Sequence, residues 1–144
     1  MGLMTMTKDE REAFLAEARV GVLAVASGGP PLQVPIWYSY EPGGEVLIIT
    51  GGDSPKAALL HEAGNASLCV QTETPPYKYV VVEGSVTIDN GVDDKLRADI
   101  AHHYLGDELG DMYLQATAES VASSVTVRLT PERWRTTDFA KQWG

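Results

Sequence analysis

The apolar residues of the chain fall mainly into short runs that predict strands. Residues 20–26 (VGVLAVA) are apolar on both faces, and turns rich in glycine and proline separate them from two further runs at 32–40 and 45–50. The later runs lie at residues 65–71, 77–88, 125–129 and 134–139. Short strands that are apolar on both faces are typical of buried sheets and small barrels. We therefore expect a mainly β (α+β) fold, a small barrel whose openings are covered by helices.

The chain begins with a helix signal and continues as one domain. Thr7 and Glu10 form a capping-box pair, which opens a helix that ends near residue 18. Residues 1–6 are expected to be a loose, flexible end. Because the chain has 144 residues with no repeat and no linker-like stretch, residues 7–144 are expected to form a single domain with a sizeable core.

Glycine and proline interrupt the regular pattern at four positions. Gly84 breaks the longest strand and predicts a bulge or a barrel corner. Gly106 and Gly110 divide the helical region at 92–119 into two helices. Pro35 lies inside the second strand, where it cannot donate a hydrogen bond to a neighbour. That strand is therefore either an ordinary edge strand or a place where a flat ligand meets the backbone.

Composition and charge exclude several classes of partner. The formal net charge of −9 disfavours binding to nucleic acid or to an anionic membrane through the overall field. No apolar run approaches the roughly 20 residues of a membrane span. The single cysteine, Cys69, cannot form an intrachain disulfide, which fits a reducing cytoplasm. The three histidines do not have the spacing of metal ligands, so no metal site is expected.

The most specific local pattern is the start of the helix at 54–63. Ser54 or Asp53 can cap this helix and Pro55 suits its first position. Lys56 then follows where an acidic residue would be favoured. Free backbone N–H groups, the preceding glycines and a cation together form a seat for a phosphate. The alternative is an ordinary capped helix whose lysine points into solvent.

Two further groups extend this candidate binding segment. Gln33, Pro35 and Trp37 share one face of the strand just upstream. Trp37 can stack on a planar ring or serve as an ordinary core or interface residue. Residues 77–79 (Tyr-Lys-Tyr) form either a second rim or a solvated strand start. The chain contains no GxGxxG, Walker loop, HExxH, CxxC or GxSxG motif, so the corresponding nucleotide, metal, redox and hydrolase sites are not expected.

These residues occur in an order that resembles a known superfamily. The segments RVGVLAVAS, PLQVPIWYSYEPGGEVLIITGGDSPKAALL, NASLCVQTE and YKYVVVEGSVTI resemble the pyridoxamine 5′-phosphate oxidase-like, flavin-binding split-barrel superfamily. Within it, the chain is most similar to the actinobacterial branch of flavin- and deazaflavin-dependent oxidoreductases. The resemblance covers roughly residues 8–140. It implies a six-stranded antiparallel split β-barrel with flanking helices.

The resemblance also implies a homodimer that holds FMN or coenzyme F-420, a deazaflavin, in a groove between subunits. The strand at residues 33–37 would run beside the ring system, and the lysine at position 56 would contact the cofactor phosphate. We therefore expect the following residues to bind the cofactor: Gln33, Val34, Pro35, Trp37, Thr50, Gly51, Ser54, Lys56 and Lys78.

Two departures from the superfamily pattern narrow the expected chemistry. Many relatives have Arg-Lys where this chain has Pro55 and Lys56, so one cation for the phosphate is missing. A charge-assisted hydrogen bond contributes about 1.5–3 kcal/mol, and Arg19, Lys78 or a residue of the other subunit can compensate. The sequence ERWR at 132–135 lacks the downstream partner found in true pyridoxamine phosphate oxidases. Vitamin B6 oxidation is therefore not expected.

The resulting hypothesis is an F-420-dependent oxidoreductase that transfers hydride from the reduced cofactor to an unsaturated small-molecule acceptor. The alternatives are an FMN-binding flavoprotein reductase and a non-enzymatic protein that binds flavin or haem. No catalytic side chain is assigned, and Tyr38, Tyr79 and solvent are the proton sources considered. The acceptor is not identified by any motif.

Overall fold

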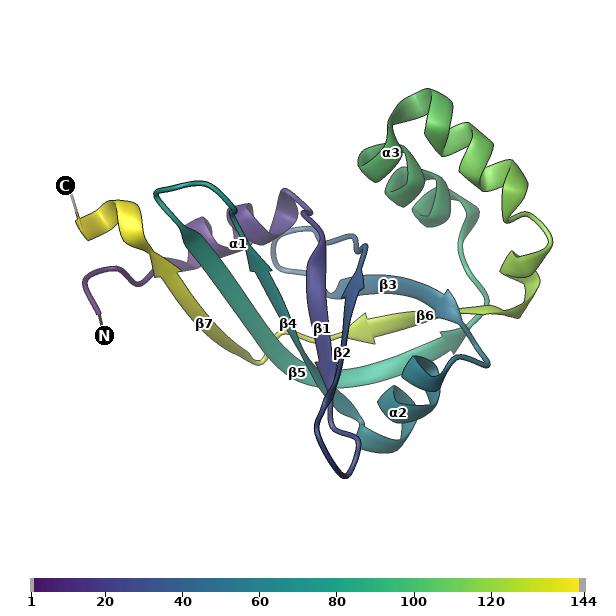
Figure 1. Ribbon diagram of the computed structural model, residues 1–144, viewed down its shortest axis with the longest axis horizontal. Helices are drawn as coiled ribbons and strands as arrows, with labels where there is room; N and C mark the ends of the chain where they lie inside the picture. The colour runs from purple at the N-terminus through teal and green to yellow at the C-terminus, as the bar shows by residue number, and fades with distance from the viewer. Residues whose placement is uncertain (1, 143–144) are drawn as a thin grey trace.

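The computed structural model describes residues 2–142, which form seven strands and three helices (Figure 1). The strands are β1 (Gly21–Val25), β2 (Leu32–Ile36), β3 (Val46–Gly51), β4 (Asn65–Gln71), β5 (Lys78–Asn90), β6 (Ser124–Leu129) and β7 (Arg133–Asp138). The helices are α1 (Lys8–Ala16), α2 (Pro55–Ala63) and α3 (Asp94–Ala116), with short 3-10 turns η1 (Ser120–Ser123) and η2 (Phe139–Gln142). No helix in this described part is long and apolar enough to cross a membrane.

Six strands form one antiparallel path in the order β2-β1-β4-β5-β6-β3, and β7 adds to β5 as a seventh. The two ends of the path meet at a bridge between Ser39 and Leu47, whose backbone N–H groups each donate to the other's carbonyl at 2.9 Å. The predicted six-stranded split barrel is confirmed. The predicted hairpin between 32–40 and 45–50 is reduced to this bridge, because β2 pairs with β1 and β3 pairs with β6.

Strand β5 turns the corner of the half-barrel at Gly84. Residues 78–83 of β5 pair with β7, whereas residues 86–90 pair with β6. A Cβ atom on Gly84 would lie 1.7 Å from the carbonyl oxygen of Thr130. Only glycine allows the two backbones to approach this closely, so the predicted barrel corner is confirmed.

The core lies inside the half-barrel, where alternate residues of the strands point inward. The fully buried side chains include Leu23, Val25, Ile48, Leu68, Val70, Val80, Val82, Val127 and Leu129. Leu15 of α1 and Leu60 of α2 are also fully buried and join the helices to this core. The opposite face of β1 remains open, since Val22 is 40% exposed.

Helix α1 begins with the predicted capping box: the Glu10 N–H donates to Thr7 Oγ1 and the Thr7 N–H donates to Glu10 Oε1. The segment before it differs from the expected loose end. Met6 is buried and its N–H donates to Thr136 Oγ1 at 3.0 Å, while the Met4 carbonyl accepts from Asp138. Residues 4–6 are held because they line up beside β7. Met1 lies outside the described residues.

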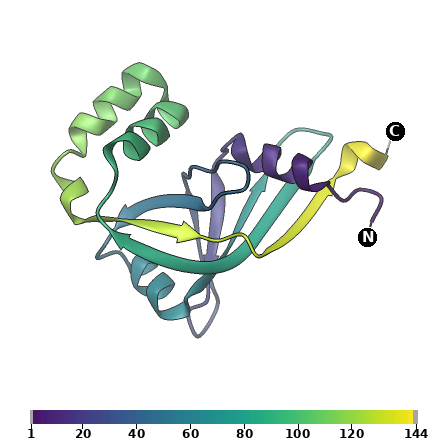
Figure 2. The ribbon, with the colours of Figure 1, turned by 180° about the vertical axis from the view of Figure 1, so that it is seen from behind.

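Helix α3 is a hairpin of two arms, one on each side of Gly106 (Figure 2). Gly106 has φ 81° and interrupts the helix, as predicted. Gly110, the other predicted break, instead lies inside the second arm. A Cβ atom there would be 2.5 Å from the His102 ring. The absence of a side chain at Gly110 lets the second arm pack closely on the first.

Candidate functional site

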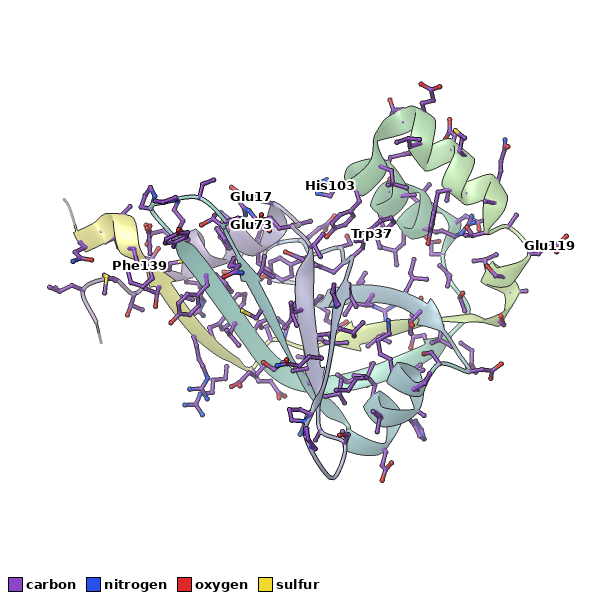
Figure 3. The ribbon with its side chains drawn as sticks, in the orientation of Figure 1. Glu17, Trp37, Glu73, His103, Glu119 and Phe139 are labelled. Atoms are coloured by element: carbon purple, nitrogen blue, oxygen red, sulfur yellow. The ribbon has the colours of Figure 1, made fainter. Side chains whose placement is uncertain are left out.

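A cleft of about 410 Å³ lies between the barrel and the α3 hairpin. The barrel wall consists of Val20, Pro35, Ile36, Trp37, Ile49 and Lys56. The hairpin wall consists of Arg97, Ile100, Ala101 and Tyr113. Trp37 lies where the barrel faces α3 (Figure 3). The cleft thus combines an apolar lining with two cations, a composition that suits a largely apolar ligand with a negatively charged group.

Lys56 reaches the cleft from the first turn of α2. Ser54 caps this helix by accepting a hydrogen bond from the Ala57 N–H at 3.1 Å, and the Thr50 hydroxyl lies 3.5 Å from the Ser54 hydroxyl. Lys56 is half-buried, and burial lowers the pKa of its ammonium group. Within residues 2–142, Lys56 forms no ion pair. A cation that loses hydration without gaining a protein anion is well placed to receive an anionic ligand.

Arg97 is the second charged residue on the cleft wall, and sequence reasoning missed it. Its Nη2 donates to the Leu114 carbonyl and to Thr117 Oγ1, both at 2.7 Å. The spacing from Arg97 to Ile100 places both on one helix face, a signal that is present in the sequence. The sequence does not reveal that this face closes over Lys56, because the turn at Gly106 and the placement of the hairpin are tertiary features.

A second cavity of about 410 Å³ lies on the outer side of β1, β4 and β5. Its lining includes two carboxylates, Glu83 and Glu132, and one cation, Arg133. Glu132 already accepts hydrogen bonds from the N–H and hydroxyl of Ser85. Because carboxylates repel an anion, the cleft beside Lys56 is the better candidate for a ligand that carries a phosphate.

Trp37 packs against the hairpin through two aromatic contacts. Its ring is stacked on that of Tyr104, with centroids 5.1 Å apart and 5° between the planes. The Tyr113 ring lies 5.5 Å away and is tilted by 53°. One face of the indole is therefore occupied by protein. Trp37 contributes to the cleft as part of an aromatic wall that joins β2 to α3.

The structure brings some of the predicted binding residues together and separates others. Pro35, Trp37 and Lys56 line one cleft. Thr50, Gly51 and Ser54 form the turn that leads into α2, and Gln33 and Val34 lie farther along β2. Lys78 lies outside the cleft, opposite Asp138 in the pairing of β5 with β7. Binding of a cofactor by any of these nine residues stays a prediction.

Arg19, one of the residues considered as a replacement for the missing cation, is occupied elsewhere. The Arg19 guanidinium lies 4.4 Å from the centre of the Phe14 ring and pairs with Glu17.

None of the three histidines lines the cleft: His61 is exposed, His102 lies 2.7 Å from Asp111, and His103 lies 2.7 Å from the Ala18 carbonyl. No group of three metal-ligating side chains occurs among the described residues.

The half-barrel with its flanking helices is the architecture of a flavin-binding split barrel, a class that includes oxidoreductases. The family model described as pyridoxamine 5′-phosphate oxidase matches residues 7–138. The chain therefore belongs to the pyridoxamine 5′-phosphate oxidase family. No curated protein matches the chain in sequence.

Solved structures share this fold at low sequence identity. The conserved hypothetical protein Rv2991 from Mycobacterium tuberculosis is 22% identical with a TM-score of 0.78, over 100% of this chain and 92% of that one. The FAD and heme binding protein from Mycobacterium smegmatis is 16% identical with a TM-score of 0.69, over 95% and 73%. An F420 reductase is 18% identical with a TM-score of 0.62, over 86% and 94%. At these identities the likeness shows the fold alone.

Proposed function

We propose that the protein is an F-420-dependent oxidoreductase that reduces an unsaturated small-molecule acceptor. The observation that carries this proposal is the cleft in which Lys56, at the start of α2, and the end of β2 share one apolar lining without a carboxylate. Such a cleft can hold a planar ring and its phosphate at the same time. A neighbouring fold that is named an F420 reductase adds support for this choice of cofactor.

The residues present fit a phosphate-bearing flavin or deazaflavin. Lys56 would hold the phosphate through its ammonium group and its own backbone N–H, because Pro55 has no N–H and the N–H groups of Ala57 and Ala58 are bonded to Ser54. Strand β2 pairs only with β1 along its length in the described chain, so its other edge offers backbone groups to the edge of a ring. Ile36, Ile49 and Ile100 would exclude water from the ring. When bound, the reduced deazaflavin supplies the hydride donor.

The proton that completes the reduction is proposed to come from solvent through the open cleft. The Tyr38 hydroxyl donates to the Leu15 carbonyl at 2.7 Å inside the core. Burial raises the pKa of Tyr38, so this phenol is a poor source of protons. Tyr79 lies on β5, outside the residues that line the cleft.

An FMN-binding flavoprotein is the second candidate, because the same cleft accepts the same ring shape. FMN carries a terminal phosphate with a charge of about −1.5 to −2, whereas the phosphodiester of F-420 carries one negative charge. Pro55 leaves a single cation at the start of α2, which favours the diester. A haem-binding role has less support, since no histidine of the described chain lines the cleft.

Titration of the purified protein with F-420 and with FMN, followed by fluorescence, tests this assignment. We expect submicromolar binding of F-420, reduced at least about ten-fold in Lys56→Gln, because one charge-assisted bond is lost. Lys95→Gln is the matched control: Lys95 is exposed, pairs with Asp99 and does not line the cleft. Tight binding of FMN without affinity for F-420 would contradict the proposed cofactor.

We also propose that the protein is a homodimer through the outer face of its sheet. Strand register aligns an apolar row there, consisting of Pro35, Val22, Cys69 and Val81. Pro35 also lines the cleft, so a partner on this face would lie beside the cofactor site. We expect Val22→Glu to shift sedimentation from dimer to monomer while Thr87→Glu, on the far half of β5, leaves the dimer intact. A monomeric wild-type protein would contradict this proposal.

A further inference from the structure

The first arm of α3 fixes the hairpin to the barrel. The Tyr104 hydroxyl donates to the Arg19 carbonyl at 2.9 Å and accepts from the Tyr38 N–H at 3.2 Å. The His103 ring nitrogen lies 2.7 Å from the Ala18 carbonyl. Together with the stacking of Tyr104 on Trp37, these bonds give the first arm a defined position beside β2.

The second arm is held by hydrogen bonds to the first arm and by the contact of Tyr113 with Trp37. Arg97 bonds the Leu114 carbonyl and the Thr117 hydroxyl, and His102 pairs with Asp111. In the described chain, no hydrogen bond runs from residues 107–116 to the barrel. Tyr113, which lines the cleft, is therefore positioned by its contact with Trp37 and by the hydrogen bonds of Arg97 to the end of this arm.

Arg97 has donor capacity that the hairpin does not use. A guanidinium group has five N–H donors, and Arg97 makes both of its hydrogen bonds to the hairpin through Nη2. Its Nη1 and Nε have no acceptor among the described residues. Arg97 and Lys56 approach the cleft from different walls, and neither meets a carboxylate in its lining. In a chain of net charge −9, this concentration of positive charge indicates a specific anion site.

We propose that Arg97 is a second anion-binding residue of the cleft, and that a phosphate bound to its unused donors also fastens the second arm of α3. The inference rests on the proposed function, in which a phosphate-bearing cofactor occupies this cleft. A planar guanidinium can hold the arm through Nη2 and the phosphate through its other nitrogens at the same time. Binding of the phosphate then limits the motion of Arg97, one of the residues that position Tyr113.

The decisive experiment compares cofactors with and without their phosphate. FMN and riboflavin differ in the phosphate alone, whereas F-420 is paired with its ribityl deazaflavin core, which lacks the phosphate together with the acidic tail that the phosphate carries. We expect Arg97→Gln to weaken binding of the phosphate-bearing member about ten-fold or more, and to change binding of its partner by less than about two-fold. An equal loss for both members of a pair would overturn the inference, because it would mean that Arg97 only shapes the hairpin.

Two variants separate anion binding from support of the hairpin. Thr117→Val removes one acceptor of Arg97 and keeps the cation, so the affinity ratio within each pair should stay as in the wild type. Lys95→Gln removes one charge from the same helix outside the cleft, and we expect the same unchanged ratio. If Lys95→Gln lowered the ratio as much as Arg97→Gln does, general electrostatics would explain the effect and the proposed site would be wrong.

Hydrogen exchange tests the coupling to the second arm. In the wild type, the phosphate-bearing member should slow exchange at residues 107–116 more than its phosphate-free partner does, and in Arg97→Gln this difference should vanish. Equal protection by both members in the wild type would contradict the coupling.

Inorganic phosphate distinguishes failure of the inference from failure of the proposed function. If neither ring system binds, the proposed function is wrong, and phosphate still probes the site. We expect phosphate to raise the melting temperature of the wild type above a chloride control of equal ionic strength, with a smaller rise in Arg97→Gln. An equal rise in both proteins, or none in the wild type, would overturn the role of Arg97.

Discussion

The two walls of the cleft are held in place by different kinds of interaction. On the barrel wall, Ile49 and Lys56 belong to elements that are fixed by backbone pairing and by buried residues such as Leu60. On the hairpin wall, Tyr113 depends on a few side-chain contacts, made by Arg97 and His102 of the first arm and by Trp37 of the barrel. Elements held in this second way open at lower free energy. The difference indicates that the barrel wall with Lys56 is a rigid binding surface for the charged group of a ligand, and that the hairpin wall can adjust to the remainder of the ligand.

The largest effect is expected at the corner of the barrel. Gly84→Ala would place a methyl group 1.7 Å from the Thr130 carbonyl oxygen, and two backbones cannot move apart without breaking the pairing around them. We expect a loss of at least about 4 kcal/mol of unfolding free energy, or no folded protein. Gly29→Ala is the control, because nothing lies within 4 Å of its added Cβ atom. Urea unfolding of both variants measures the difference, and a mild effect at Gly84 would show that the corner is not rigid.

The same substitution in the two walls gives the next comparison. Leu60 of α2 is fully buried in the core, whereas Leu109 of the second arm is 57% exposed. Leu60→Ala should lower the free energy of unfolding by about 2–5 kcal/mol, because it leaves a cavity. Leu109→Ala should change it by less than about 0.5 kcal/mol. Comparable losses in urea titrations would mean that the hairpin is part of the cooperative core.

The barrel wall was predictable from sequence because its signals are local. The alternation of apolar residues predicts β4 with its observed bounds, and the Ser54-Pro55 pair predicts the start of α2. Gly84 predicts a bulge or a barrel corner, and the change of partner from β7 to β6 along β5 confirms the corner. Each of these features follows from the preferences of neighbouring residues, so no knowledge of distant contacts was needed.

The hairpin wall was predictable only in part, because its position depends on long-range contacts. The break at Gly106 is visible in the sequence, but the role of Gly110 depends on His102 of the other arm. Nothing near Arg97 in the sequence indicates that it faces the same cleft as Lys56. Residues 4–6 were expected to be loose for the same reason, since their partners lie on β7 more than a hundred residues later.

A smaller effect is expected from loosening the hairpin itself. Asp111→Ala removes the partner of His102 and should lower protection from hydrogen exchange at residues 107–116 by no more than about 1 kcal/mol. The urea midpoint of the whole protein should not change. Asp107→Ala, at another exposed position of the same arm, is the control. A shift of the global midpoint in Asp111→Ala would show that the second arm unfolds together with the barrel.

A small effect on stability, of opposite sign, is expected for the charged residue of the barrel wall. Burial lowers the pKa of Lys56 below 10.5, so the folded protein binds this proton less tightly than the unfolded chain does. The resulting penalty is present at neutral pH and disappears as the pH rises through the lowered pKa towards 10.5. Lys56→Met should therefore stabilise the ligand-free protein at neutral pH by less than about 1 kcal/mol, with the gain shrinking in alkaline solution.

Inorganic phosphate should make the wild type more stable than Lys56→Met, because a bound phosphate stabilises a folded state that offers it a cation. In thermal melts at neutral pH, the wild type should gain stability with added phosphate, and Lys56→Met should gain little over a chloride control. If Lys56→Met is less stable than the wild type when no ligand is present, the lysine supports the fold. If Lys56→Met is instead more stable without ligand and gains little from phosphate, the barrel wall retains a charge that destabilises the free protein and stabilises the complex.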